Sequence, residues 1–127
     1  MRVALLSSAS SIHTIQWANG LSAAGVDVHV ISQHPVLDEP VDSNVTFHFI
    51  PFRGALGYFT MVPEVKKILC QVNPDVVNAH YASGYATTAR LVGYRPWLLS
   101  VWGSDVYQFP YASAIHKWWL VGNLKSA

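Results

Sequence analysis

The chain has 127 residues, a length that suits one domain, and 51% of them are hydrophobic, so it can bury a substantial core. Only 12% are charged and the formal net charge is +1, which excludes the broad basic surface of a nucleic-acid-binding protein. The single cysteine, Cys70, excludes an intrachain disulfide and fits a reducing, cytoplasmic location. No apolar run approaches the roughly 20 residues of a membrane-spanning helix.

The first half of the chain predicts three strands and one helix. Residues 3–6 are a short apolar run that serines follow, which indicates a buried strand. Apolar residues then recur at helical spacing over residues 12–21, and Gly25 marks the end of that helix. Residues 27–32 and 45–50 read as the second and third strands, with an acidic, proline-containing loop between them.

The middle of the chain is harder to assign. Two glycines interrupt the apolar, aromatic segment at residues 51–62, which therefore predicts neither a helix nor a strand clearly. A helical stripe follows over residues 63–72, with a proline suited to its first turn and an Asn-Pro pair at its end. Residues 75–80 then form an apolar run that predicts the fourth strand.

The last third predicts a helix capped by Ser83 and closed by Gly93, a fifth strand at 97–102 and a final helix at 111–124. The late strands are apolar throughout, as in parallel sheets that are covered on both faces. The pattern predicts a single α/β domain over residues 1–127. We expect a doubly wound, Rossmann-like parallel sheet with strand order 3-2-1-4-5 and helices on both faces.

Open sheets of this kind bind ligands outside the carboxyl ends of the strands, where the winding reverses. The reversal would lie between the first and fourth strands. Three polar turns follow strands there, at residues 7–13, 80–84 and 103–105. These turns are the candidate site.

Three side chains in these turns could do chemistry. His80 could be a general base or a hydrogen-bond donor to a ligand hydroxyl, or a strand-end histidine satisfied by backbone groups. Asp105 could orient a hydroxyl, or cap the turn that follows it. His13 lies in the first turn of a helix and could face the cleft, or pack on the surface.

The serine-rich turn opens a helix, so its N–H groups could bind a phosphate, or the serines could be plain helix caps. The turn contains no glycine, which disfavours a tightly bound dinucleotide. The six histidines are scattered, and Asp38, Glu39 and Asp42 read as a solvated loop. We therefore expect no metal site and no cofactor.

Aromatic and basic residues are mixed in two segments, and such mixtures suit a membrane surface. Ordinary core packing, or contact with a further domain, is the alternative. The residues are Phe52, Arg53, Tyr58, Phe59, Tyr111, His116, Lys117, Trp118 and Trp119.

Four stretches, residues 11–17, 25–32, 74–81 and 100–106, resemble the N-terminal domain of family-4 glycosyltransferases in order and spacing. The resemblance implies a GT-B enzyme of two Rossmann-like domains, with the acceptor bound by the N-terminal one. Transfer would be retaining and metal-free, from a nucleotide-sugar co-substrate to a glycan or lipid-linked acceptor. Many members build polysaccharide, lipopolysaccharide or glycolipids at the cytoplasmic membrane face.

On this resemblance, His80 and Asp105 would be catalytic and would position the acceptor hydroxyl and the donor sugar. Many relatives carry a histidine where this chain has Trp102, so that role would pass to Asp105 or His80. The expected substrate-binding residues are Ser8, Ser10, Ser11, His13, Tyr81, Ser83, Gly84, Trp102, Gly103 and Ser104.

The family's donor site uses two glutamates seven residues apart, and the glutamates of this chain are Glu39 and Glu64. We therefore expect the donor-binding C-terminal domain to be missing from this chain, and the chain alone to be inactive. The alternative function is a non-catalytic Rossmann-like module that binds a small ligand or a partner.

Overall fold

The computed structural model describes residues 1–36, 38–52, 54–103, 111 and 113–127, and a parallel sheet forms their centre. The strands are β1 (Arg2–Leu6), β2 (Asp27–Ser32), β3 (Thr46–Phe49), β4 (Val76–His80) and β5 (Trp97–Ser100). The helices are α1 (Ile12–Ala23), α2 (Gly54–Thr60), α3 (Val62–Val72), α4 (Tyr85–Val92) and α6 (Ala114–Ser126).

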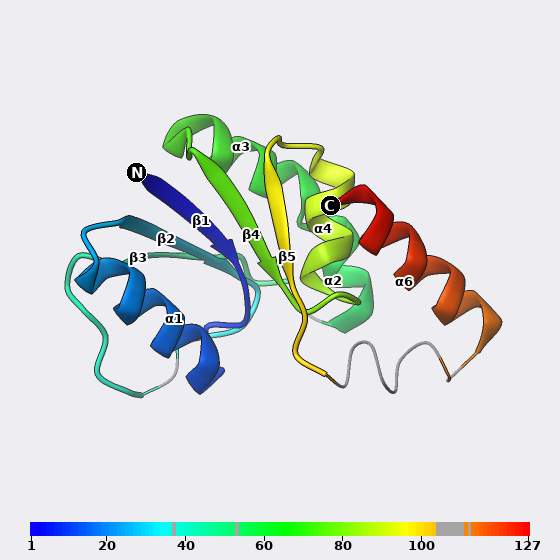
Figure 1. Ribbon diagram of the computed structural model, residues 1–127, viewed down its shortest axis with the longest axis horizontal. Helices are drawn as coiled ribbons and strands as arrows, with labels where there is room; N and C mark the ends of the chain where they lie inside the picture. Colours follow the sequence, from blue (N-terminus) through cyan, green and yellow to red (C-terminus); the bar gives the residue numbers. More distant parts are fainter. Residues whose placement is uncertain (37, 53, 104–110, 112) are drawn as a thin grey trace.

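The strand order is β3-β2-β1-β4-β5, and the prediction of a doubly wound parallel sheet is confirmed (Figure 1). Leu6 at the end of β1 lies beside Ile31 of β2 and Ala79 of β4. The chain first winds outward from β1 to β3 and then returns to β4 on the other side. The carboxyl ends of β1 and β4 are therefore neighbours where the winding reverses.

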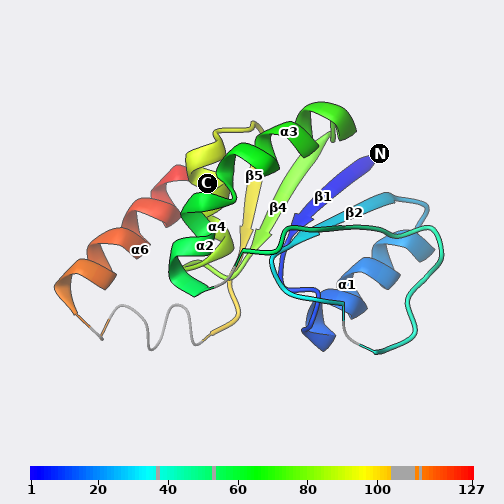
Figure 2. The same ribbon diagram turned by 180° about the vertical axis from the view of Figure 1, so that it is seen from behind.

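Alternate residues of β1 point into two separate cores, as the pleat of a strand requires. Ala4 and Leu6 join a cluster with side chains of α3 and α4. Val3 and Leu5 join a second cluster that includes Ala18 of α1. The two views accordingly show α1 on one face of the sheet and α2, α3 and α4 on the other (Figures 1 and 2).

Local residues set the helix ends. Ser11 caps α1, because its Oγ accepts a hydrogen bond from the backbone N–H of His13 at 3.3 Å. Gly25 follows α1 with a φ of +87°, as its predicted role as the stop requires. At the end of α3, Asn73 takes a left-handed conformation with a φ of +49°. None of the helices in the described residues is both long and apolar enough to cross a bilayer.

The later elements differ in detail from the predictions. The apolar segment at residues 51–62 contains α2. Its Gly57 is buried so tightly that a Cβ there would lie 2.2 Å from Oε1 of Gln33. Ser83 does not cap α4, whose N-cap is Gly84 without a side-chain bond. Strand β5 ends at Ser100, two residues early, and α6 begins later than predicted, after its N-cap Ser113.

Candidate functional site

Three chain segments meet at the carboxyl ends of the central strands. The serine turn follows β1, the turn at 80–84 follows β4, and residues 101–103 follow β5. The register brings the last two together, because His80 lies beside Ser100 and the N–H of Tyr81 donates to the carbonyl of Ser100 at 2.9 Å. The fold thus brings the turns at 7–13 and 80–84, and residue 103 of the third, to one edge of the sheet (Figure 1).

His80 is fully buried at the end of β4. Its Nδ1 accepts a hydrogen bond from the indole Nε1–H of Trp102 at 3.3 Å. Burial lowers the pKa of His80 from 6.5 to about 4, because the charged imidazolium would lose its hydration. The ring is therefore neutral near pH 7.

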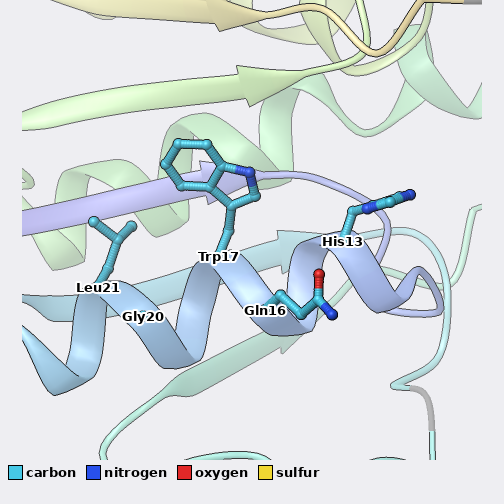
Figure 3. A pocket seen from close by; sticks show the side chains of 5 residues that line it. All are labelled: His13, Gln16, Trp17, Gly20 and Leu21. Atoms are coloured by element: carbon cyan, nitrogen blue, oxygen red, sulfur yellow. The ribbon is translucent and has the colours of Figure 1, made fainter.

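The imidazole of His80 and three further rings form a continuous cluster. His13 and Trp17 lie one turn apart on α1, and their side chains stand on the same side of the helix (Figure 3). Trp17 meets His80 edge to face with ring centroids 5.4 Å apart, and His13 meets Trp102 in the same way at 5.4 Å. Tyr81 adds a fifth ring, 5.8 Å from Trp102. The cluster ties α1 to the segments that follow β4 and β5.

A groove of about 320 Å³ runs along α1 beside this cluster (Figure 3). His13, Gln16 and Trp17 line it, together with Gly20 and Leu21. Trp17 is 48% exposed, so one part of its indole ring is open to a ligand. The groove thus combines an apolar ring with an imidazole and an amide that can hydrogen-bond.

Tyr81 has an unusual backbone. Its φ is +82°, a left-handed value that costs a residue with a side chain of order 1–3 kcal/mol. Such conformations cluster at functional sites, where the surroundings hold them. Gly103, on the neighbouring segment, has a φ of +108°, which glycine adopts readily.

Most polar groups of the serine turn already have hydrogen-bond partners within the chain. The Oγ atoms of Ser8 and Ser10 lie 2.9 Å apart, and Ser11 caps α1. The N–H of Ala9 donates to Ser32 Oγ at 3.0 Å, and the N–H of Ser11 donates to the carbonyl of Ser8 at 3.1 Å. These bonds favour the helix-cap interpretation of the turn over a phosphate cradle.

The remaining predicted residues do not join the ring cluster. Ser83 and Gly84 line a second groove of about 360 Å³ between α2, α4 and α6, with the aromatic residues Tyr58, Phe59 and Trp119. Ser104 and Asp105 lie outside the described residues.

Sequence reasoning missed Trp17 and a polar network at the end of β2. The signal for Trp17 is its spacing of four residues from His13, which places both on one helix face. In the network, the hydroxyl of Tyr85 lies 2.7 Å from Nδ1 of His34 and 3.3 Å from Oγ of Ser32. Burial raises the pKa of Tyr85 well above its ordinary value, so this phenol stays protonated.

The described residues contain no group of three His, Cys, Asp or Glu side chains that could hold a metal ion. Two histidines do lie side by side: Nδ1 of His29 and Nε2 of His48 are 3.0 Å apart. The ring centroids are 5.3 Å apart, so the two nitrogens face each other along the line that joins the rings. This is the geometry of an N–H···N hydrogen bond.

Comparisons with known proteins bear on the family and the fold of the chain. Residues 2–127 match the family described as "Glycosyl transferase 4-like". A search of curated proteins gives no match. Among solved structures, that of glycinamide-RNase-transformylase T from Mycobacterium tuberculosis is similar, with a TM-score of 0.53 and 16% identity. The match covers 78% of this chain and 28% of that chain, and at this identity it shows the Rossmann-like α/β fold alone.

Proposed function

The chain belongs to the glycosyl transferase 4-like family, and from that premise we propose that it is the acceptor-side, N-terminal domain of a retaining GT-B glycosyltransferase. The proposed reaction moves a hexosyl group from a nucleotide-sugar to a glycan or lipid-linked acceptor in polysaccharide, lipopolysaccharide or glycolipid synthesis. The observation that carries the proposal is the ring cluster at the winding reversal of a chain that matches this family along its length.

We propose that the groove beside α1 holds the acceptor sugar. Sugar rings present C–H groups on their faces and hydroxyls at their edges. The exposed part of the Trp17 ring suits the former, and His13 and Gln16 suit the latter. A volume of about 320 Å³ falls at the lower end of the range for small-molecule sites, which is about 300–1,000 Å³.

In the proposed transfer, the acceptor hydroxyl bonds to the anomeric carbon of the sugar as the bond from that carbon to the phosphate oxygen breaks. The hydroxyl proton passes to the departing nucleoside diphosphate. His80 and Asp105 are proposed to position the reacting groups, and the remaining predicted substrate contacts follow the three turns. The nucleotide would be bound largely by a second domain, and no metal is assigned to the reaction.

We also propose a peripheral contact with the cytoplasmic face of a membrane through α6. This helix exposes 77% of Ile115 and 69% of Trp118, and Lys117 lies between them in sequence. Apolar and aromatic side chains beside a cation suit the headgroup region of an anionic bilayer.

Sedimentation with vesicles that contain anionic lipid tests this contact. Ile115→Ser combined with Trp118→Ser should abolish co-sedimentation. Phe49→Ser should leave co-sedimentation unchanged. Phe49 is also exposed, but it lies on β3, at the edge of the sheet away from α6 (Figure 1). Equal binding by all three proteins would contradict the proposal.

The transferase proposal is tested with a longer protein that includes this chain and the proposed second domain. Release of nucleoside diphosphate from a panel of nucleotide-sugars should require that protein, and the 127-residue chain alone should show none. His80→Ala and Asp105→Ala should each cut turnover, with Phe49→Ala as the control. A ligand that binds the groove without turnover in the longer protein would instead support the binding module.

A further inference from the structure

His80 is enclosed by two indole rings from different parts of the chain. Trp17 of α1 and Trp102 after β5 both meet it edge to face, with centroids 5.4 and 6.0 Å away. The two contacts differ in chemistry, because Trp102 donates its indole N–H to Nδ1 of His80 at 3.3 Å. Trp17 therefore packs against the ring, whereas Trp102 also acts on one of its two nitrogens.

That bond determines where the imidazole carries its proton. An indole N–H can only donate, so Nδ1 of His80 must accept and is itself unprotonated. In a neutral imidazole the hydrogen then lies on Nε2. This Nε2 atom is buried and has no hydrogen-bond partner among the described residues. A buried donor without an acceptor is unfavourable, and a ligand oxygen would satisfy it.

We propose that Trp102 is a positioning residue, whose indole N–H fixes His80 as the Nε2–H tautomer so that His80 serves the cleft as a neutral hydrogen-bond donor. A general base needs a free lone pair, and here the lone pair of Nδ1 is held by Trp102. The Nε2–H group is then left to donate to an oxygen of the bound sugar, for which the rings that enclose His80 must open, because His80 is fully buried. The part played in transfer rests on the proposed function, whereas the tautomer does not.

The tautomer is measured on this chain by nitrogen NMR of the histidine rings at pH 7. The expected spectrum shows a protonated Nε2 and an unprotonated Nδ1 for His80. Trp102→Phe keeps an aromatic ring but removes the donor, so it should convert His80 to a mixture of tautomers. Trp17→Phe is the matched control and should leave the spectrum of His80 unchanged, since Trp17 touches the same ring by packing.

Two results would overturn the positioning role. One is a protonated Nδ1 in the unchanged chain. The other is a Trp102→Phe protein with a folded amide spectrum in which His80 keeps a pure Nε2–H tautomer.

The donor role is tested by two substitutions of His80 in an active full-length transferase. Glutamine places an amide N–H near the position of Nε2 but cannot act as a base, so His80→Gln should stay within about tenfold of the parent turnover. His80→Ala should lose about 10²-fold, as is typical when a single positioned donor is removed. Equal turnover in both variants, whether lost or retained, would refute the donor role. If no transferase activity is found at all, the proposed function fails and the NMR result still decides the tautomer.

Discussion

Gly84 and Tyr58 lie so close that a Cβ atom at residue 84 would stand 2.6 Å from Cζ of the tyrosine ring. Tyr58 belongs to α2 and Gly84 is the N-cap of α4, so this contact sets how closely the two helices approach. The φ of Gly84 is −89°, which any residue adopts. Space, and not backbone freedom, therefore requires glycine here.

Gly84→Ala should destabilise the chain by about 1–3 kcal/mol, the usual cost of overpacking a well-filled site. Urea unfolding followed by tryptophan fluorescence measures the loss. Combining it with Tyr58→Leu should recover part of the stability that the alanine costs, because a smaller side chain makes room for the methyl group.

Gly20→Ala is the matched control. Gly20 lies inside α1, and a Cβ there meets nothing within 4 Å. Alanine in a helix interior is better than glycine by about 1 kcal/mol, so this variant should be more stable than the parent chain. Equal effects of the two substitutions would contradict the packing argument at Gly84.

The sheet could be predicted from sequence because its buried strands are short apolar runs separated by helical stripes. The helix α2 could not be predicted, because its two glycines indicate a break in helical structure. Gly57 stands there for a reason that only the fold reveals, the close approach of the Gln33 side chain. The end of β5 could not be predicted either, since Val101 and Trp102 continue the apolar pattern beyond Ser100, the last residue of the strand.

The site could be predicted only as separate turns. The rule for open sheets nominated His13 and His80 one by one, and the family resemblance added Trp102. Their ring contacts then appear in the fold. That the indole of Trp102 reaches one particular nitrogen of His80 depends on side-chain geometry that no spacing encodes. Ser83 lies only three residues after His80, yet it lines the other groove, because it stands just before α4 and that groove lies between α2, α4 and α6.

The side chain of Thr87 makes three hydrogen bonds, and two of them hold α6 against α4. Its Oγ1 donates to the carbonyl of Ser83 at 2.6 Å and accepts from Nε1 of Trp119 at 2.8 Å and Nδ2 of Asn123 at 3.1 Å. Thr87→Val keeps the shape but leaves these groups unmatched. It should cost about 3 kcal/mol in urea unfolding and speed amide hydrogen exchange in α6.

The neighbouring Thr88→Val provides the comparison. Thr88 is equally buried, and its Oγ1 donates to the carbonyl of Tyr58 at 2.7 Å. Its loss should cost about 1 kcal/mol and leave exchange in α6 near the parent rate. Similar exchange in both variants would show that Thr87 is not the link between the helices.

His29 and His48 join β2 to β3 near the edge of the sheet. The Nε2 of His29 lies 3.4 Å from the carboxylate of Asp27, which can only accept, so His29 carries its proton there. Its Nδ1 is then the acceptor, and Nε2 of His48 donates to it at 3.0 Å. His48→Gln keeps a donor and should retain stability, whereas His48→Ala should lose about 1 kcal/mol in urea unfolding. Equal losses would mean that the bond contributes nothing measurable.

The buried His80 makes stability depend on pH. Its pKa is about 4 in the folded chain and near 6.5 when unfolded, so the unfolded chain binds more protons between these values. The contribution is fully present above pH 6.5 and is lost as the pH falls toward 4. At 1.36 kcal/mol for each pH unit, the loss by pH 4 is about 3 kcal/mol. Burial also lowers the pKa of His34 and His48, which adds to the effect in the same direction.

Urea midpoints between pH 7.5 and pH 4 measure this dependence, and His80→Phe isolates the part that His80 contributes. Phenylalanine fills similar space between Trp17 and Trp102 and has no proton to bind. The variant should therefore lose less stability than the parent over this pH range, with the gap widest near pH 4. Parallel curves for the two proteins would mean that His80 titrates near its ordinary pKa, so that its burial does not make stability depend on pH.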